Sequence, residues 1–345
     1  KVDEKSEDQI ILAEQNLYKI GDTGKSDTDF KSFLKAIHEA VDVANAAHHR
    51  DGNLAGISTG FIDLDKKMGG LHSSDLIILA GRPSMGKTSL ATNIAYNITK
   101  SFKKVENSDA ISAAENGGIV GFFSLEMSAE QLAARILSET AEIPSEQIRR
   151  GDMTENEFRR FVEAAKSIQN APLFIDDTPA LNIAQLASRA RRLKRTHGLD
   201  ALIIDYLQLV RAASNRESRV NEISEITQGL KAIAKELSVP VVALSQLSRA
   251  VEQRDDKKPQ LSDLRESGSI EQDADVVMFV YREAYYLERK EPRPATVEHA
   301  EWQAKMNEVS NLAEIIIGKQ RHGPTGNVML EFEAMFTKFK DTQNT

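Results

Sequence analysis

The sequence contains no cysteine, which excludes disulfide bonds and metal sites built from thiolates. It also lacks an uninterrupted apolar run of the roughly 18 residues that a membrane-spanning helix needs, and its charged first residues do not form a signal-peptide pattern. We therefore predict neither a membrane span nor export. A cytoplasmic protein with no membrane partner is expected.

A general surplus of positive charge is lacking as well. The 345 residues carry a formal net charge of −8 at pH 7, which argues against a surface that binds nucleic acid everywhere. Basic residues are instead concentrated between residues 189 and 219. Any contact with nucleic acid is therefore predicted to be local, as for a strand held in a channel or groove.

The most informative stretch that is present runs from Gly81 to Thr88. It reads GRPSMGKT and fits G-x-x-x-x-G-K-[ST] at every fixed position. An apolar segment precedes it and a helical pattern follows it, which is the order that a phosphate-binding loop needs. Glycines at 81 and 86 let the backbone approach a triphosphate, and unpaired N–H groups at a helix N-terminus favour an anion. The alternative is a chance glycine-rich turn.

Within this loop we expect Lys87 to reach the β- and γ-phosphates and Thr88 to bind Mg²⁺. The other phosphate contacts are expected from the loop backbone and the first helical turn. The predicted nucleotide-binding residues are Ser84, Met85, Gly86, Lys87, Thr88 and Ser89.

From residue 57 onward, short apolar segments alternate with helical patterns, which is typical of a parallel α/β sheet. Strands are predicted at 76–80, 119–124, 172–176, 201–205, 239–245, 275–281 and 313–318, and helices at 89–100, 128–140, 154–169, 182–197 and 220–236. Residues 328–339 alternate as a hairpin. Two polar excursions, 103–118 and 284–311, interrupt this alternation of strands and helices. A short helix is expected within the second, at 297–308.

Upstream of this core, apolar residues recur at intervals of three and four from Phe30 to Ala44, which predicts an amphipathic helix. Such a helix has to bury its apolar stripe. Two alternatives stay open: the helix packs on its own domain, or it docks on a neighbouring subunit.

Polar residues at the ends of predicted strands would complete a hydrolytic site, because parallel strands deliver their carboxyl ends to one crevice. Asp205 is expected to hold Mg²⁺ near Thr88. Glu126 is placed to polarise the attacking water, although an acidic residue in a first helical turn is also common. Gln246 can hydrogen-bond phosphate in one nucleotide state, or be an ordinary polar residue at a strand end.

Two cations, Lys319 and Arg321, follow the predicted strand 313–318. Residues two apart in an extended segment point the same way, so both side chains can approach one anion. An arginine supplied to a phosphoryl-transfer site is worth about 10³ to 10⁵ in rate. If the pair comes from a neighbouring subunit, hydrolysis requires assembly; the alternative is two solvated charges.

Six motifs stand out in order: GRPSMGKT at 81–88, SLEM at 124–127, IIDYLQ at 203–208, SQLSR at 245–249, DLRESG at 263–268 and GKQRHG at 318–323. Together they resemble the motifs of the bacterial replicative DNA helicases of the DnaB family. The resemblance covers roughly residues 50 to 340. It implies an α/β fold: a RecA-like P-loop NTPase core with a mostly parallel central sheet, a C-terminal β-hairpin and an N-terminal linker helix.

The resemblance further implies an ATP-dependent DNA helicase that uses ATP and Mg²⁺. A homohexameric ring would encircle single-stranded DNA and move 5′ to 3′ at the replication fork. Glu126 would activate water, Gln246 would couple nucleotide state to DNA grip, and Lys319 and Arg321 would act on the adjacent subunit. The family's DNA loop matches Arg265, Glu266 and Gly268, and the basic loop with Arg211 and Arg216 is a further channel candidate. An ordinary solvated loop is the alternative.

In this interpretation, residues 1–28 are the residual tail of a removed helical domain with a flexible linker. Residues 29–49 are the linker helix that docks on a neighbouring subunit, and residues 50–345 are the motor domain. The expected partners are single-stranded DNA, further copies of the chain and a helicase loader. A primase is expected for the full-length family rather than for this truncated chain, and the expected location is the replication forks of the bacterial nucleoid.

Two other classes of protein remain as alternatives. A RecA-like strand-exchange or repair ATPase would form an open filament, whereas the linker helix and the pair Lys319 and Arg321 favour a ring. A nucleotide-gated loader or adaptor would bind without unwinding, and the presence of Glu126 and Arg321 argues against it.

Overall fold

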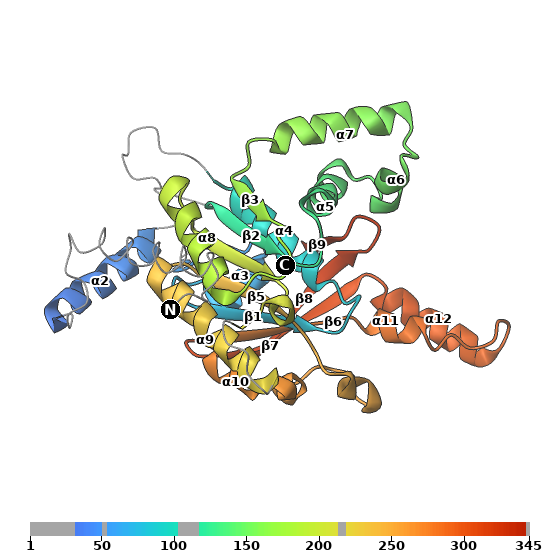
Figure 1. Cartoon of the computed structure of the whole chain (residues 1–345). Coiled ribbons are helices and arrows are strands. Elements are labelled where there is room, and N and C mark those ends of the chain that lie inside the picture. The colour runs from blue at the N-terminus through green and yellow to red at the C-terminus, as the bar shows by residue number, and fades with distance from the viewer. Residues whose placement is uncertain (1–31, 50–53, 103–116, 213–218, 343–345) are drawn as a thin grey trace, which may run out of the picture.

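The computed structural model describes residues 32–49, 54–102, 117–212 and 219–342. Its centre is a nine-stranded sheet with the order β3-β2-β4-β5-β1-β6-β7-β8-β9 (Figure 1). The strands are β1 Leu76–Gly81, β2 Val120–Ser124, β3 Leu173–Asp176, β4 Ala201–Asp205, β5 Val241–Gln246, β6 Val276–Tyr281, β7 Leu312–Gln320, β8 Gly326–Glu333 and β9 Lys338–Asp341.

The helices surround this sheet and extend beyond it. They are α2 Phe33–His49, α3 Ile62–Met68, α4 Lys87–Lys100, α5 Ala129–Ala141, α6 Ser145–Arg150, α7 Glu155–Ile168, α8 Ile183–Thr196, α9 Arg219–Leu237, α10 Gly268–Asp273, α11 Glu283–Glu288 and α12 Val297–Val309, with 3₁₀ turns η1 Leu207–Leu209, η2 Arg249–Gln253 and η3 Leu261–Ser267. Within the described ranges, no helix combines the length and apolar character needed to cross a bilayer.

Strands β1 to β6 pair in parallel, and β7, β8 and β9 continue the sheet in antiparallel pairs. The mostly parallel sheet and the C-terminal hairpin predicted from the sequence are confirmed. The reversed direction of β7 was not predicted. Its reason is that α11 and α12 form an arm that projects from the sheet (Figure 1) instead of packing on one face as a crossover helix does.

The central strands β1, β2, β4, β5 and β6 are buried on both faces, which explains their continuous apolar character. Along β1 the side chains alternate: Ile77 and Leu79 pack in the core that contains α4, and Ile78 and Ala80 pack in the core that contains α8 and α9. This period of two places neighbouring residues of one strand in two separate cores.

Three helices begin at reciprocal capping boxes, with Ser128 before α5, Thr154 before α7 and Asn182 before α8. Each cap satisfies N–H groups that otherwise lack an intrahelical partner. The helices predicted at 128–140, 154–169 and 182–197 begin within a residue of these starts. The short helices α3, α6, α10 and α11 were not predicted, because six or seven residues are too few to show a helical period.

Helix α2 extends away from the sheet (Figure 1). The side chains of Phe33, Leu34, Ile37 and Val41 are 81%, 65%, 41% and 58% exposed. Among the side chains of α2 that the structure describes, these four therefore present their apolar surface to solvent rather than to the chain's own domain. The segments 1–31 and 103–116, which include the predicted tail and most of the first excursion, lie outside the described residues.

Candidate active site

The phosphate loop joins the end of β1 at Gly81 to the start of α4 at Lys87. Gly86 has φ 95°, a left-handed conformation that favours glycine. A Cβ atom there would also lie 3.0 Å from Cζ of Phe339. Both the backbone conformation and the limited space therefore require glycine at this position.

The ammonium group of Lys87 turns back toward the loop. Its Nζ donates to the carbonyl oxygens of Gly81 at 2.8 Å and Arg82 at 3.1 Å. Burial lowers the pKa of Lys87 to about 8, and the charges of Asp205 and Glu126 oppose this shift. A phosphate group would supply a stronger partner for this desolvated cation than two neutral carbonyls do.

Asp205 ends β4 and is 2% exposed. Burial raises its pKa, whereas a hydrogen bond with the Thr88 side chain lowers it. Its Oδ2 has no hydrogen-bond partner among the described residues. A buried, unpaired carboxylate oxygen beside a threonine hydroxyl fits a hydrated Mg²⁺ ion. In the described ranges no group of three His, Asp or Glu residues is placed to hold a metal, so the other ligands would come from water and phosphate.

Glu126 lies just beyond β2, which pairs with β4 so that Ser124 is opposite Asp205. The backbone N–H of Leu125 donates to the carbonyl of Asp205 at 2.7 Å, which fixes the chain directly before Glu126. Glu126 is exposed, and its charge influences the pKa values of both Lys87 and Asp205. The structure thus brings the predicted base into the same site as the loop and the aspartate predicted to bind the metal.

Gln246 ends β5 opposite Gly81 and is exposed. Gln208, the last residue of the motif at 203–208, had no predicted role but holds this strand end. Its Nε2 donates to Oγ of Ser245 at 3.0 Å and to the carbonyl of Gln246 at 3.2 Å. Its Oε1 accepts the N–H of Gln246 at 3.3 Å. An amide three residues after the strand-ending aspartate was the available signal.

Two further arginines at this site were also missed. Arg135 of α5 has its pKa lowered by burial, with the carboxylates of Asp205 and Glu126 opposing the shift. Arg282 is 8% exposed, and its Nη1 donates to the carbonyl of Ser84 in the phosphate loop at 3.5 Å. Both residues stand on elements far from the phosphate loop in sequence, so no local motif predicts their approach.

Lys319 and Arg321 lie at the opposite edge of the sheet, where the parallel strands β1 and β6 begin. The N–H of Arg321 donates to the carbonyl of Asp275 at 2.9 Å, and the N–H of Leu76, the first residue of β1, donates to the Asp275 carboxylate at 2.8 Å. Since β1 has six residues, and a strand rises about 3.3 Å per residue, the start of β1 and its end at Gly81 are separated by most of the sheet. This pair therefore does not join the phosphate loop of its own chain.

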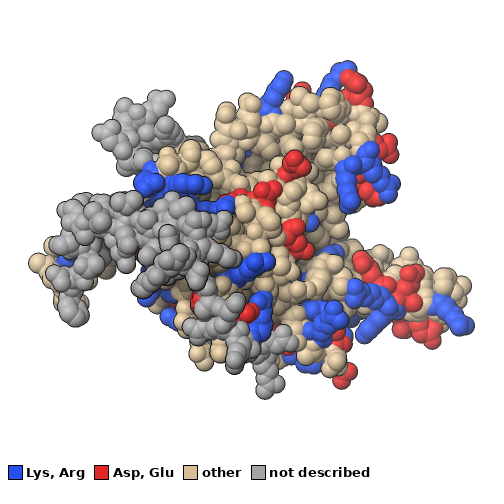
Figure 2. Space-filling view, in the orientation of Figure 1, with Lys and Arg blue, Asp and Glu red and all other residues tan. Residues whose placement is uncertain are grey.

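The candidate DNA residues are only partly described. Arg265 and Glu266 belong to η3 and Gly268 begins α10, but their side chains lie outside the described part of the chain. Arg211 is exposed and its backbone pairs with the segment before α8, whereas Arg216 lies in the segment 213–218, which is not described. On the face in Figure 2, positive and negative side chains are interspersed, in line with local rather than general contacts to nucleic acid.

In this fold the strand ends of a parallel sheet surround a phosphate loop, and antiparallel strands extend the sheet and bring two cations to its far edge. This is the arrangement of the RecA-like P-loop ATPases. Comparison with known proteins narrows this class. Residues 56–341 match the family profile of the DnaB-like helicase C-terminal domain. The chain belongs to the DnaB family of replicative DNA helicases.

The chain is 54% identical over 336 residues to the replicative DNA helicase DnaB of Rickettsia prowazekii, covering 97% of this chain and 68% of that protein. It is 44% identical over 311 residues to that of Geobacillus stearothermophilus, covering 90% and 62%. The chain thus spans about two thirds of the length of these curated relatives.

Solved structures give the same family. An ATPase domain of known structure matches with a TM-score of 0.75 and 35% identity, over 91% of this chain and 100% of that one. A DnaB-like replicative helicase, solved to show its interactions with primase, matches with a TM-score of 0.72 and 33% identity, over 97% and 75%. These neighbours are RecA-like helicase ATPase domains, in line with the predicted fold class.

Proposed function

We propose that this chain is the motor of a replicative DNA helicase in which ATP hydrolysis drives a hexameric ring 5′ to 3′ along single-stranded DNA. The observation that carries the proposal is the position of Lys319 and Arg321, at the sheet edge opposite the phosphate loop. A complete site then needs the loop of one chain and the cations of another. Such head-to-tail contacts form a ring when the rotation from one subunit to the next closes, as proposed here.

ATP and Mg²⁺ are the proposed cofactors. Thr88 and Asp205 would hold the Mg²⁺ ion, which would neutralise negative charge on the phosphates. Lys87 and the N–H groups of residues 84–89 bind the phosphates. Glu126 orients and deprotonates the attacking water, and Gln246, opposite Gly81, transmits the nucleotide state along β5.

Arg321, with Lys319 beside it, enters the site of the neighbouring subunit and stabilises charge that develops in the transition state. The linker helix α2 holds neighbouring subunits together in the assembly. Its exposed apolar side chains make it the segment that docks on the next subunit, because apolar surface of this extent favours a partner.

Single-stranded DNA is the proposed substrate, held by the loop at 265–268 with Arg211 and Arg216 as further contacts. Contacts to phosphate position a strand without reading its sequence, as a motor requires. A loader that delivers the ring to DNA is a further proposed partner. The relative solved with primase makes primase a partner to test, and a cytoplasmic location at replication forks follows from this role.

The proposal is tested by unwinding of a forked duplex with a 5′ tail, with ATP and Mg²⁺ present, and with the assembly mass recorded in the same buffer. We expect a hexamer to separate the strands and the Lys87→Ala variant to assemble without separating them. Unwinding only from a 3′ tail, or hydrolysis without any strand separation, would contradict the proposal.

A further inference from the structure

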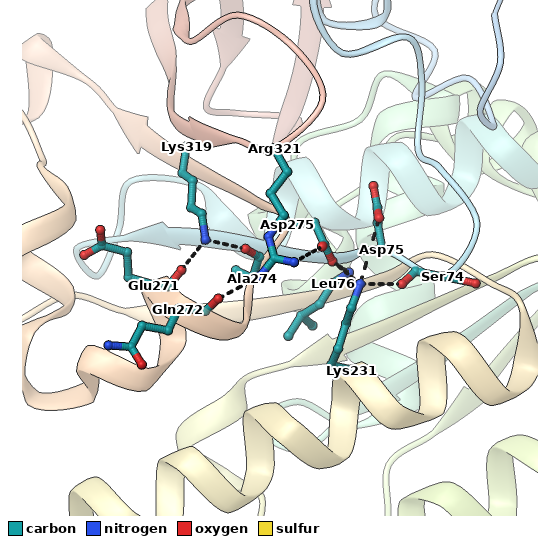
Figure 3. Close-up of polar contacts among 10 residues, drawn as sticks. All are labelled: Ser74, Asp75, Leu76, Lys231, Glu271, Gln272, Ala274, Asp275, Lys319 and Arg321. Carbon is teal, nitrogen blue, oxygen red and sulfur yellow. Dashed lines mark hydrogen bonds and ion pairs between the residues drawn. The ribbon is translucent and has the colours of Figure 1, made fainter.

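Asp275, directly before β6, is at the centre of a buried cluster of charges (Figure 3). Its side chain is 3% exposed. The carboxylate accepts the N–H of Leu76 at 2.8 Å and a hydrogen bond from Nζ of Lys231, and its Oδ1 lies 3.4 Å from Nη1 of Arg321. One carboxylate therefore connects the start of β1, helix α9 and the residue that follows β7.

Lys319, near the end of β7, and Arg321, which follows it, are also held by carbonyl oxygens. Nζ of Lys319 donates to the carbonyls of Glu271 at 2.5 Å and Ala274 at 2.7 Å, and Nη2 of Arg321 donates to that of Gln272 at 2.9 Å. These carbonyls lie at the end of α10 and just after it, where unpaired acceptors and the helix dipole favour a positive charge.

The two cations on Asp275 differ in how firmly they are held. The Lys231 side chain is 19% exposed and also donates to the carbonyl of Ser74 at 2.8 Å. The Arg321 side chain is 44% exposed, and its contact with Asp275 is the longer one. Lys231 thus neutralises the buried carboxylate, while the guanidinium of Arg321 keeps an open side and unused donors.

We propose that Asp275 is the positioning residue for Arg321: it fixes the guanidinium at the edge of the sheet in the orientation in which it meets the phosphates of the neighbouring subunit. This inference rests on the proposed action of Arg321 in trans. A preorganised charge stabilises a transition state more than one that must first be ordered. In this proposal Asp275 acts through Arg321 and has no direct contact with the nucleotide.

A second consequence concerns α10. This helix starts at Gly268, in the loop proposed to bind DNA, and its last carbonyls hold both cations. A displacement of α10 on DNA binding would move the partners of Lys319 and Arg321 together, whereas Asp275 stays fixed by Leu76 and Lys231. We therefore expect Asp275 to matter most for hydrolysis stimulated by DNA.

The test variant, Asp275→Asn, removes the negative charge of the side chain and keeps its shape. In Asp275→Asn the side-chain oxygen can still accept the N–H of Leu76, but the guanidinium loses its anionic partner. We expect the DNA-stimulated kcat to fall about 10- to 100-fold, the range that misplacing a reacting group produces, with the KM for ATP unchanged because the phosphate loop is untouched. An unchanged kcat overturns the inference.

Asp75→Asn is the matched control. Asp75 belongs to the same cluster and lies 4.0 Å from Lys231, but the described contacts of Arg321 do not include it. The same chemical change there is expected to alter kcat less than about twofold. An equal loss in both variants would mean that general charge balance, and not the position of Arg321, is responsible.

Mixed rings separate action in trans from damage to the chain's own site. Lys87→Ala subunits lack a working loop but have intact cations. Mixed with Asp275→Asn subunits, which have an intact loop, they should restore hydrolysis above the level of either alone. No recovery, while Lys87→Ala mixed with Arg321→Ala does recover, overturns the role of Asp275 and leaves the proposed function standing. Failure of both mixtures contradicts the action of Arg321 in trans, and with it the inference.

A double variant gives an independent check. In an Arg321→Ala background, Asp275→Asn should lower kcat no further, because its target is gone. A further loss would show that Asp275 acts elsewhere. Thermal unfolding is measured for each variant. If Asp275→Asn does not fold, Asp275→Glu replaces it, because it keeps the negative charge beside Lys231 but displaces the carboxylate. The same recovery is expected in the same mixtures.

Discussion

At the scale of single residues, the site depends on charges that the fold has partly removed from water. Lys87 is bonded to two carbonyls and has its pKa lowered to about 8, while Asp205 has one unpaired, buried oxygen. Both groups are in a less favourable environment than water provides, and both would gain from a nucleotide with its metal ion. Their roles can be tested separately from DNA unwinding.

The first prediction concerns the pH dependence of nucleotide binding. Phosphates bind the protonated form of Lys87 and raise its pKa, so above pH 8 binding must take up a proton. Affinity for a non-hydrolysable ATP analogue should therefore be nearly constant below about pH 8 and weaken up to about tenfold per pH unit above it. Titration calorimetry in buffers of different ionisation enthalpy measures both the affinity and the proton uptake. Lys87→Arg should bind with no such dependence; a flat profile for the unaltered chain would contradict the role of Lys87.

The second prediction concerns Glu126. Because this residue is exposed, Glu126→Gln should fold normally and bind ATP and DNA as before. Loss of a general base should lower the single-turnover rate of hydrolysis by about 10² to 10⁴. Glu130→Gln, an exposed change in the first turn of α5, is the control and should leave the rate unchanged. A loss below about tenfold in Glu126→Gln would assign water activation to another residue.

At the scale of elements, parallel strand ends and helix starts position the site. The register of β2, β4, β5 and β1 brings Ser124, Asp205, Gln246 and Gly81 to one edge, and α5 presents Arg135 to the same region. The position of α5 is fixed at its start, where the Ser128 hydroxyl accepts the N–H of Gln131. This capping box stands two residues after Glu126.

The third prediction follows from that cap. Ser128→Ala and Thr154→Ala each remove the cap of one helix, and each should lower the free energy of unfolding by about 1 kcal/mol in chemical denaturation. Only Ser128→Ala should also slow ATP hydrolysis, since α7, which Thr154 caps, has no described contact with the phosphate loop. Equal effects on hydrolysis would mean that stability alone, and not the position of α5, sets the rate.

At the scale of the whole molecule, the chain contributes one half to each of two nucleotide sites: the phosphate loop to one and the pair of cations to the other. Its phosphate loop and its pair of cations lie at opposite edges of the sheet, and α2 extends from the domain with an exposed apolar stripe. Each of these features is completed by another copy of the chain in the proposed ring. Assembly and hydrolysis should therefore fail together.

The fourth prediction tests this link. Leu34 is 65% exposed, so Leu34→Asp should leave the unfolding temperature of the isolated chain unchanged while shifting the mass in solution from rings toward single subunits. The DNA-stimulated hydrolysis rate should fall in parallel. Val297→Asp, at a 73% exposed position on α12, introduces the same charge elsewhere and should not change the mass measured by analytical ultracentrifugation. Intact rings in Leu34→Asp would contradict docking by α2.

The sequence by itself determined the features that depend on near neighbours. The spacing from Gly81 to Thr88, the alternation within the strands and the helical patterns between them each act over a few residues, so they predicted the phosphate loop, the α/β class and most helix starts. Asp205, Glu126 and Gln246 were singled out because each lies at the end of an apolar strand or within two residues of it. The six motifs, with their order, predicted the family.

Only the tertiary structure decided where the two cations stand and what holds them. Leu76, Lys231, Asp275 and Arg321 lie in or directly beside four different elements, and Leu76 and Asp275 are separated by 199 residues. Their meeting depends on the order of the strands and on the reversed direction of β7, which no local pattern encodes. The physical reason is that a buried charge selects its partners by distance in space, whereas a sequence motif records only distance along the chain.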